Sequence, residues 1–299
     1  MSITELSDLH SIKQIGTNAV GVAFKSTPIL AIPGLTEDVT DRIADAGGEK
    51  VTYTVWDTAL TQNAASITQD SIVNSRTGVT PSKLSLTSYD ETAISKTISI
   101  DIDKFAMDDS SEDVQAHLSQ LVGKEFSRVI QDSLITNGVG SDKSVDITGE
   151  TDKKMSVAAI VRARLAWGEH ASEIGNPTLF LTTVQFADLV KDSDFKNLST
   201  GGSNTPVKAN EDWSKYVIAS VYGVNIVLCD SLPNTGGATP KYTSLLIGEG
   251  AFGLHIGNVP ETDKVISQGS RIHTLDTHFR FSTTLFRHAP KRVVKLITN

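Results

Sequence analysis

Apolar residues recur at steps of three and four between residues 109 and 138, the longest segment of the chain with one clear period. This spacing places them along one side of a helix. Asp109, Ser110 and Ser111 supply capping oxygens, and Asn137-Gly138 forms a left-handed end. The predicted apolar stripe contains Val114, Leu118, Leu121, Val122, Phe126, Val129, Ile130 and Leu134. We therefore predict a long amphipathic helix whose core residues are Val114, Leu118, Val122, Phe126, Ile130 and Leu134.

Gly123 lies in the middle of this predicted helix. It costs about 1 kcal/mol relative to alanine unless another segment packs closely against it. A helix of roughly 25 residues is about 38 Å long, which is long for one globular domain. Two interpretations follow: a central core helix, or a strut on which a flat subunit is built.

Alternation of apolar and polar residues predicts strands in residues 49–57 and 83–103, separated by a polar, Thr/Ser/Asn-rich passage that ends near Pro81. A two-stranded excursion of this length exceeds what an isolated hairpin stabilises in water, so we expect it to lie against another chain. In the last of these strands the isoleucines face one side and the polar residues the other. The two sets are Ile98, Ile100 and Ile102, and Ser99, Asp101 and Asp103.

The N-terminal region has no sustained period. Residues 1–33 contain the breakers Gly16, Gly21, Pro28 and Pro33, and we predict an extended arm. Residues 35–46 then follow a short helical pattern, with Thr36 as the cap and Val39 and Ile43 facing inward.

The second half mixes helices and strands. A polar loop leads to a predicted helix over residues 156–170, with Val157, Ile160, Val161, Leu165 and Trp167 inward. A buried strand over 176–183, a short helix over 184–192 and a long loop come next. Three strand-like runs then occupy 215–223, 224–230 and 242–248. We predict a compact domain over residues 139–258, followed by strands up to residue 299.

Composition limits the function. The formal charge of −8 argues against a protein whose main task is gripping nucleic acid, although a container for DNA remains compatible with it. Cys229 is the single cysteine, which excludes an intramolecular disulfide, and we expect it to be a small buried residue. The first residues lack the pattern of a signal peptide, and the longest uncharged apolar run, 217–229, is short for a bilayer. We expect a soluble chain that is made inside a cell.

One stretch is typical of nucleotide binding. Residues 248–253 read GxGxxG after a strand-like run. The next residues carry Gly257 and Pro260 and do not favour the helix on which such a site depends, so we interpret the motif as a glycine-rich turn. Nucleotide binding stays open as an alternative. The seven histidines, His117 among them, form no zinc motif, and no nucleophile is paired with a base. We expect no metal, no cofactor and no catalysis.

The charges divide between two regions. Lys and Arg stand at 271, 280, 287, 291, 292 and 295, against the acid Asp276. An opposite set comprises Asp101, Asp103, Asp108, Asp109, Glu112 and Asp113. The two regions either pair with each other or form solvated faces of opposite sign.

Several passages, in their order, resemble the major capsid proteins of tailed double-stranded DNA bacteriophages, whose fold encapsulins and the herpesvirus capsid floor share. VTYTVWDTAL and GVTPSKLSLTSYDETAISKTISID resemble the extended loop of such proteins. LVKDSDFKNL and VYGVNIVLCDSLP resemble their axial domain. GAFGLHIGNVPETDKV and RIHTLDTHFRFSTTLFRHAPKRVVKL resemble the return through the peripheral domain, including a His-x-Pro step at 288–290.

The resemblance implies an α+β phage capsid fold. Its expected parts are an N-terminal arm (1–33), a short helix of the peripheral domain (34–48), an extended loop (49–100), a peripheral domain with the spine helix (101–138), an axial domain (139–258) and return strands of the peripheral domain (259–299). We expect contacts between subunits at Trp56, Arg76, Lys83 and Tyr89. Lys83 is either a crosslinking lysine, as in some relatives, or an ordinary salt-bridge partner.

The implied function is structural: self-assembly into hexamers and pentamers that close an icosahedral head around double-stranded DNA. Expected partners are other copies of the chain, a separate scaffolding protein, a portal protein and decoration proteins, with no membrane and no sequence-specific DNA binding. The expected location is the virion, after synthesis in the bacterial host cytoplasm. An encapsulin-like compartment is the first alternative, and an enzyme using the turn at 248–253 is the second.

Overall fold

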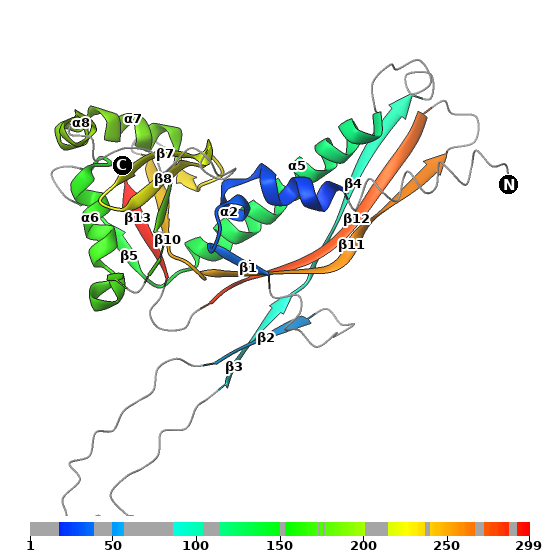
Figure 1. The fold of residues 1–299 in the computed structure, drawn as a ribbon, viewed down its shortest axis with the longest axis horizontal. Coiled ribbons are helices and arrows are strands. Elements are labelled where there is room, and N and C mark those ends of the chain that lie inside the picture. The colour runs from blue at the N-terminus through cyan, green and yellow to red at the C-terminus, as the bar shows by residue number, and fades with distance from the viewer. Residues whose placement is uncertain are drawn as a thin grey trace, which may run out of the picture.

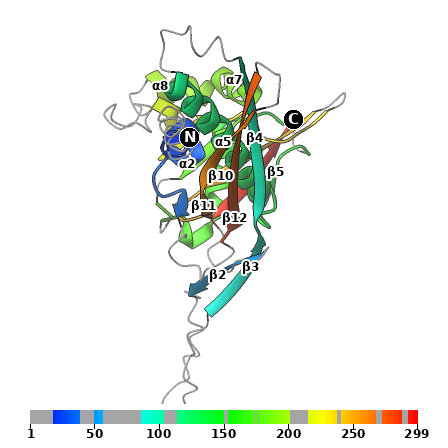
Figure 2. The same ribbon diagram turned by 90° about the vertical axis from the view of Figure 1, so that its right-hand side faces the viewer.

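The computed structural model describes residues 18–38, 50–56, 86–103, 114–149, 153–172, 174–175, 177–200, 215–236, 240–266, 272–286 and 292–299. These residues form an elongated molecule with three recognisable parts (Figure 1). A compact lobe of helices and short strands lies at one end, and long strands beside one long helix extend to the other. A two-stranded hairpin of residues 50–56 and 86–92 projects below the body. Its second strand continues the line of the strand over residues 94–103 (Figure 2).

The long part is a four-stranded sheet in the order β1-β11-β12-β4. The strands are β1 (Thr36–Asp38), β11 (Phe252–Ile266), β12 (Ile272–Leu285) and β4 (Ile94–Asp103). β1 runs parallel to β11, and the other two pairs are antiparallel. Helix α5 (Val114–Val139) crosses one face of this sheet, and its apolar side chains pack against those of the strands.

The compact lobe contains a seven-stranded sheet in the order β5-β13-β10-β6-β8-β7, with β9 paired to β10. The strands are β5 (Ser144–Asp146), β6 (Thr178–Leu181), β7 (Val217–Val221), β8 (Val224–Leu228), β9 (Asn234–Thr235), β10 (Lys241–Ile247) and β13 (Val293–Thr298). The helices of the lobe are α6 (Val157–Leu165), the 3-10 helix η3 (Gly168–Ser172), α7 (Thr183–Lys191) and α8 (Ser193–Thr200).

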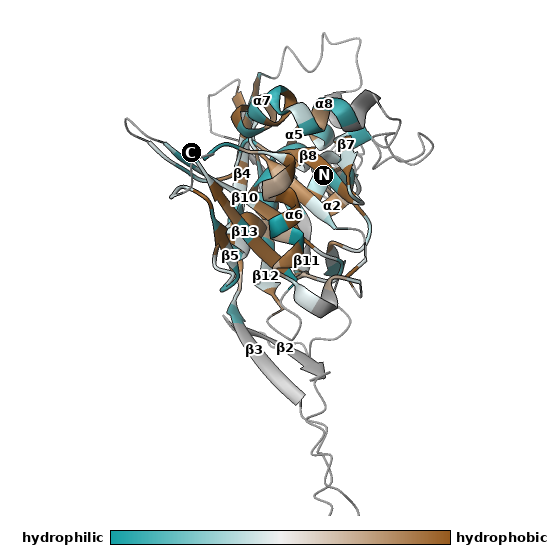
Figure 3. Cartoon of the chain, turned by 90° about the vertical axis from the view of Figure 1, so that its left-hand side faces the viewer, coloured by the Kyte–Doolittle hydropathy of each residue, from teal (hydrophilic) through white to brown (hydrophobic). Residues whose placement is uncertain are grey.

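One core joins the two sheets. It combines Phe126 and Ile130 of α5 with Phe281 of β12, and also with Phe180 and Leu245 of the seven-stranded sheet. A second cluster fills the opposite face of that sheet, under α6 and α7. The apolar residues accordingly lie along the inner strands of the lobe (Figure 3). Because the larger cluster reaches across both sheets, α5 lies at the junction between them.

Helix α7 begins where its sequence predicts. The Thr182 side chain accepts a hydrogen bond from the Gln185 amide, and the Gln185 side chain returns to the Thr182 amide, which completes a capping box. Gln185 is buried, and its Nε2 also donates to Thr298 Oγ1 at 2.9 Å. One side chain therefore fixes both the start of α7 and its attachment to β13.

The extended conformation predicted for the arm is wrong over residues 18–26, which are helical, and α2 (Pro28–Ala31) follows. Ala19 and Ala23 are buried at helical spacing, and this short period was hidden by the neighbouring glycines. The helical segment packs on α5 beside Gly123, where an added Cβ would lie 2.7 Å from the Ala19 carbonyl oxygen. The close packing of another segment against Gly123, which would explain a glycine in the middle of the helix, is therefore present.

The helix predicted over residues 35–46 is wrong at its start. Thr36 to Asp38 form β1, in parallel register with Phe252 to Leu254 of β11. Pairing with a long strand outweighs the weak helical preference of three residues. Val39 and Ile43 lie outside the described residues.

The predicted end of the long helix is also wrong. Helix α5 continues through Asn137 and Gly138 to Val139. Gly138 is close to the Leu245 side chain, and Asn137 Nδ2 donates to the Thr283 carbonyl at 3.0 Å. Because these tertiary contacts hold both residues in the helix, they do not form the predicted helix end. Leu121, placed on the apolar stripe, is 44% exposed. It lies beside the buried row rather than within it.

Most of the other predicted elements are confirmed. Strands β2 (Lys50–Trp56), β3 (Leu86–Thr92) and β4 occupy the predicted ranges, and the isoleucines of β4 pack against Leu118 and Val122. Strands β6, β7, β8 and β10 and helices α6 and α7 are also present. Leu165 is an exception, because it was placed inward and is 66% exposed. Helix α8 was not predicted.

The sheets do not divide at the boundary predicted between residues 258 and 259. Strand β11 enters the four-stranded sheet at Phe252, and β13 belongs to the seven-stranded sheet beside β10. The C-terminal segment therefore returns first through the long sheet and then into the compact lobe. Alternating residue patterns define strands, but they do not show which sheet a strand joins.

Candidate assembly surfaces

The hairpin β2–β3 projects from the body of the molecule (Figure 1). Its strands pair antiparallel, from Lys50 opposite Thr92 to Trp56 opposite Leu86. Tyr89 lies opposite Tyr53 within this ladder. Of the residues predicted to contact a neighbour, Trp56 and Tyr89 are therefore in the hairpin, on opposite strands. Arg76 and Lys83 lie outside the described residues.

The hairpin is attached to the body at its root. Ala93 alone separates β3 from β4, and Ile94 of β4 already pairs with Phe281 of β12. Beside this point the Thr284 hydroxyl donates to Glu91 Oε1 at 3.0 Å. A two-stranded ribbon has no face to bury by itself and is marginal in water. A ribbon held mainly at one end is suited to lie on another surface.

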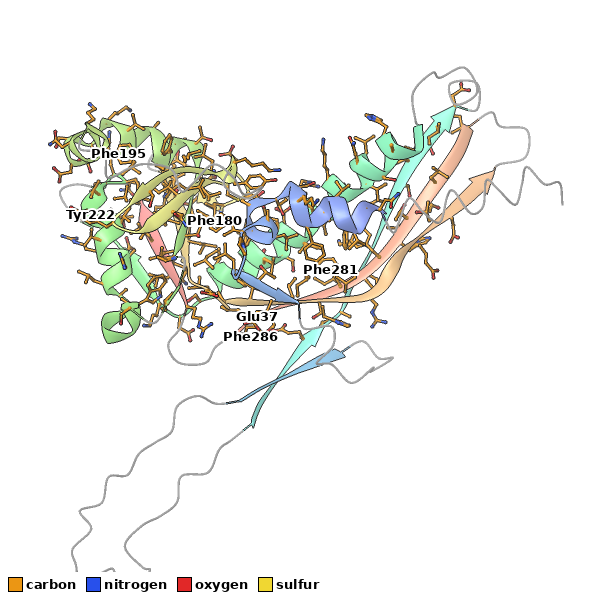
Figure 4. All side chains as sticks on the ribbon, in the orientation of Figure 1. Glu37, Phe180, Phe195, Tyr222, Phe281 and Phe286 are labelled. Carbon is orange, nitrogen blue, oxygen red and sulfur yellow. The ribbon has the colours of Figure 1, made fainter. Side chains whose placement is uncertain are left out.

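Five of the six predicted core residues of the long helix have described side chains, and these line its sheet-facing side. Leu118, Val122, Phe126, Ile130 and Leu134 are all buried, and Val114 is the first residue of α5. The Phe126 ring lies 4.3 Å from that of Phe279 and 6.3 Å from that of Phe281, measured between centroids. This aromatic cluster holds α5 on β12, and Figure 4 shows Phe281 beside the helix.

The opposite side of α5 is charged. Arg128 pairs with Glu125 at 2.6 Å and with Asp132 at 3.5 Å, one turn away on either side. The hydrogen bond from Arg128 lowers the pKa of Glu125, burial acts in the opposite direction, and the charge of Arg128 lowers the pKa further. These side chains are well exposed, so each pair adds little to stability. His117 is also exposed on this helix.

The glycine motif at 248–253 joins the two sheets. It links β10 directly to β11, so a strand follows the motif where a nucleotide site requires a helix. Gly250 has a φ of +65°, and its amide donates to the Gly34 carbonyl. Arg292 Nη1 donates to the Glu249 carbonyl at 2.6 Å. The glycines let three chain segments approach one another closely.

The acidic and basic regions are described only in part: Asp101 and Asp103 lie on β4, and Arg280 lies on the neighbouring strand β12. Asp101 Oδ1 accepts a hydrogen bond from the Thr274 hydroxyl at 2.7 Å. His278 Nδ1 and the Thr97 hydroxyl lie 2.8 Å apart, and His278 Nε2 is 3.8 Å from Asp263. The contacts between β4 and β12 therefore include hydroxyl groups as well as main-chain pairing.

Cys229 and its neighbour Asp230 in the lobe have shifted pKa values. Burial raises the pKa of the Cys229 thiol to about 11. Asp230 accepts hydrogen bonds from the hydroxyl and the amide of Thr183, at 2.6 and 3.1 Å, and both lower its pKa. Asp230 therefore stays charged at the start of α7, and Cys229 stays protonated.

The part of the chain that the structure describes contains no group of three His, Cys, Asp or Glu residues that could hold a metal ion. None of its helices is long and apolar enough to cross a membrane.

Comparison with known proteins gives matches at the level of structure. No protein-family model and no curated protein matches the sequence. The capsid of Ralstonia phage GP4 matches with a TM-score of 0.64 at 10% identity, over 88% of this chain and 86% of that one. The acid-stable capsid of Helicobacter pylori bacteriophage KHP30 matches with a TM-score of 0.62 at 13% identity, over 91% and 90%. The chain has a phage capsid fold.

A third capsid, that of cyanophage Pam1, matches with a TM-score of 0.57 at 14% identity, over 84% of this chain and 85% of that one. These alignments cover most of both chains, so the likeness extends over most of the fold rather than one motif. The capsid fold was predicted from the order of weak sequence passages, and this prediction is confirmed.

Some surface residues of this capsid fold escaped the sequence analysis. Tyr222 is 56% exposed in the turn between β7 and β8, and Leu165 is 66% exposed at the end of α6. Gly223 between two apolar runs is a turn signal, although Tyr-Gly is not one of the residue pairs that hairpin turns favour. Nothing in the sequence alone shows that the end of α6 lies beside that turn.

Proposed function

We propose that this chain is the major capsid protein of a tailed double-stranded DNA phage, a structural subunit without catalytic activity. The observation that carries the proposal is the capsid fold, matched over 88% of the chain. The projecting hairpin supports it, because a two-stranded ribbon is marginal in water and gains a surface to lie on when copies come together. The subunits would form hexamers and pentamers that close an icosahedral head in the virion, after synthesis in the host cytoplasm.

The charge of the chain fits a container. A formal charge of −8 disfavours tight binding to phosphates, so packed DNA would be enclosed without being gripped. Other copies are the first partner of the subunit. A separate scaffolding protein, a portal protein and decoration proteins are the further partners that this role implies.

The content of isolated particles tests the proposal against an encapsulin-like compartment. Particles from the infected host should protect double-stranded DNA from nuclease. The amount of protected DNA per particle should match the internal volume of the shell. Particles that hold one folded cargo protein and no DNA would replace the phage assignment with the compartment.

The scaffolding and crosslinking hypotheses have separate tests. Expression with and without a candidate scaffolding protein should give shells of uniform size only with it, and uniform shells from the chain alone would remove that partner. Boiling mature particles in denaturant should release monomers if Lys83 forms only an ordinary salt bridge. A ladder of covalent multimers that disappears in Lys83→Arg would instead establish crosslinking.

A further inference from the structure

The turn between β7 and β8 holds a tyrosine in an unfavourable backbone conformation. Tyr222 has a φ of 49°, and Gly223 follows with a φ of 74°. Two consecutive residues of positive φ between paired strands form a hairpin turn that favours Asn-Gly. Tyr222 is the one described residue other than glycine with a positive φ. Asparagine would relieve this strain, so the tyrosine is present in spite of local backbone preference.

The tyrosine is fixed in place by the end of α6. Arg164 Nη1 donates to the Tyr222 carbonyl, which places the end of α6 beside the turn. Leu165, the next residue along, is 66% exposed, and Tyr222 is 56% exposed. We call Leu165 and Tyr222 the tip pair. Figure 4 shows Tyr222 at the end of the compact lobe farthest from the long strands.

The tip pair contributes little to the fold of its own chain. An exposed leucine and an exposed tyrosine bury only part of their apolar surface, and the turn carries strain. Strained residues persist mainly where a function requires them. Tyrosine and arginine are the residue types that dominate the energy of protein interfaces. The tip pair therefore has the features of a docking surface.

Charge indicates what docks there. Helix α6 contains Arg162 and Arg164 and no acid, and the exposed Lys153 and Lys154 precede it. Within the chain, Lys154 Nζ already lies 3.9 Å from Asp188 of α7. Asp192 and Asp230 lie at the two ends of the same helix, so α7 of another copy offers acidic groups to this basic surface.

The exposed side of α7 has the matching properties. Val184 and Val190 are 48% and 41% exposed, and Ala187 between them is exposed too. Asp230 stays charged at the start of this helix, hydrogen-bonded to Thr183. A small apolar stripe beside a fixed negative charge complements a leucine and tyrosine beside two arginines.

We infer that the tip pair of one subunit packs on the exposed side of α7 of a neighbouring copy. The contact joins two different surfaces, and a contact of that type closes into rings when its rotation allows. The inference rests on the proposed function and adds to it the residues that join lobes within a ring.

Tyr222→Asn separates the fold of the subunit from its assembly. Asparagine removes the aromatic ring and fits the turn, so the unfolding midpoint of the unassembled subunit should be unchanged or higher. The protein concentration at which rings or shells appear should rise at least about tenfold. Leu165→Gln keeps helix propensity and should raise that concentration as well.

Ile272→Thr is the matched control, because Ile272 is 47% exposed on the distant strand β12 and threonine keeps its β-branched shape. It should leave the assembly concentration as in the natural chain. A lowered unfolding midpoint in Tyr222→Asn would mean that the tyrosine serves its own fold and would overturn the inference. Unaltered assembly of Tyr222→Asn and Leu165→Gln would also overturn it.

A double-mutant cycle tests the pairing itself. Val190→Gln alone should weaken assembly, and Leu165→Gln combined with Val190→Gln should weaken it no further than the stronger single variant. Additive effects would show that the two surfaces meet other partners. If variants assembled normally but lost DNA or a scaffolding protein, the occupant would be that molecule and not a second copy.

Failure of this inference differs from failure of the proposed function. If the natural chain forms no rings or shells at any concentration, the capsid role itself fails. If the natural chain assembles and the tip variants assemble equally well, the capsid role stands and only the tip contact is lost.

Discussion

Gly123 of α5 lies against the main chain of the helical segment 18–26: a Cβ built on Gly123 would be 2.7 Å from the Ala19 carbonyl oxygen and 2.7 Å from the Val22 Cβ. The N-terminal segment is thus seated on the long helix through a position where no side chain fits. Neither neighbouring atom is the end of a flexible side chain, so both would have to move with their backbone.

Gly123→Ala should therefore destabilise the subunit by about 1 to 3 kcal/mol, although alanine is the better helix former. Gly21→Ala is the control from the same helical segment, because nothing lies within 4 Å of a Cβ there. It should stabilise by up to about 1 kcal/mol. Chemical unfolding of both variants measures the difference, and stabilisation by Gly123→Ala would mean that the two helices are not in contact.

Phe126 is the centre of the contact between α5 and β12, being 1% exposed and flanked by Phe279 and Phe281. Phe126→Ala should cost about 3 to 5 kcal/mol, and Phe126→Asp should prevent folding by burying an unpaired charge. Leu121→Ala on the exposed side of the same helix should cost less than about 1 kcal/mol. Circular dichroism and urea unfolding distinguish these outcomes, and equal losses at 121 and 126 would contradict the assigned faces.

Cys229 makes stability depend on pH in the alkaline range. Burial raises the pKa of the folded thiol from 9.0 to about 11. Below pH 9.0 both states keep the proton, and between 9.0 and about 11 only the unfolded state loses it. The free energy of unfolding should therefore fall as pH rises across this window, by about 3 kcal/mol.

Urea unfolding of the natural chain and of Cys229→Ala, across this pH range, measures that effect. The variant has no thiol and should lack this part of the slope, whatever its stability at neutral pH. Parallel curves for the two proteins would show that the thiol is not protected.

Gly250 carries the turn between the sheets, with a φ of +65° and with Arg292 Nη1 where a Cβ would stand. Gly250→Ala should destabilise by about 1 to 3 kcal/mol, from left-handed strain and displacement of the arginine. Gly149→Ala, with open space around its Cα and an ordinary φ, should be nearly neutral. A nicotinamide nucleotide should not raise the melting temperature of the natural chain, and a rise abolished by Gly250→Val would revive the nucleotide site.

The sequence predicted elements well where one face is buried and the period is regular. Phe126, Ile130 and Leu134 repeat over several turns, and the isoleucines of β4 alternate without a break. Its predictions failed where tertiary contacts determine the local backbone conformation. Thr36 to Asp38 form a strand only because β11 lies beside them, and Gly138 stays helical because Leu245 packs on it.

The assembly surfaces were less predictable than the fold. A hairpin that needs a partner can be recognised from its length and alternation, since isolated hairpins are marginal. The exposure of Leu165 could not be recognised from the sequence, because the apolar stripe of α6 predicts that Leu165 faces inward. Only the position of the helix on the sheet leaves this side chain exposed. The hydrophobic pattern of a sequence reflects the residues that are buried within one subunit. Contacts with other copies select further residues that this pattern does not reveal.

The hairpin offers a direct prediction about assembly. Trp56 and Leu86 are Cα partners at the last described rung of the ladder, so residues 57–85 can be replaced by Asn-Gly to close it as a two-residue turn. The shortened chain should remain soluble, with an unfolding midpoint close to that of the natural subunit, and should form no shells. Intact shells from it would show that the loop is dispensable for assembly.

The central claim is that copies of this chain build a closed shell, and sedimentation velocity of the full chain expressed alone, followed by electron microscopy of the fastest species, tests it most directly. We expect rings of five and six subunits, tubes or closed shells in the natural chain. A stable monomer or dimer at high concentration would contradict the claim, because the projecting hairpin would then have no partner.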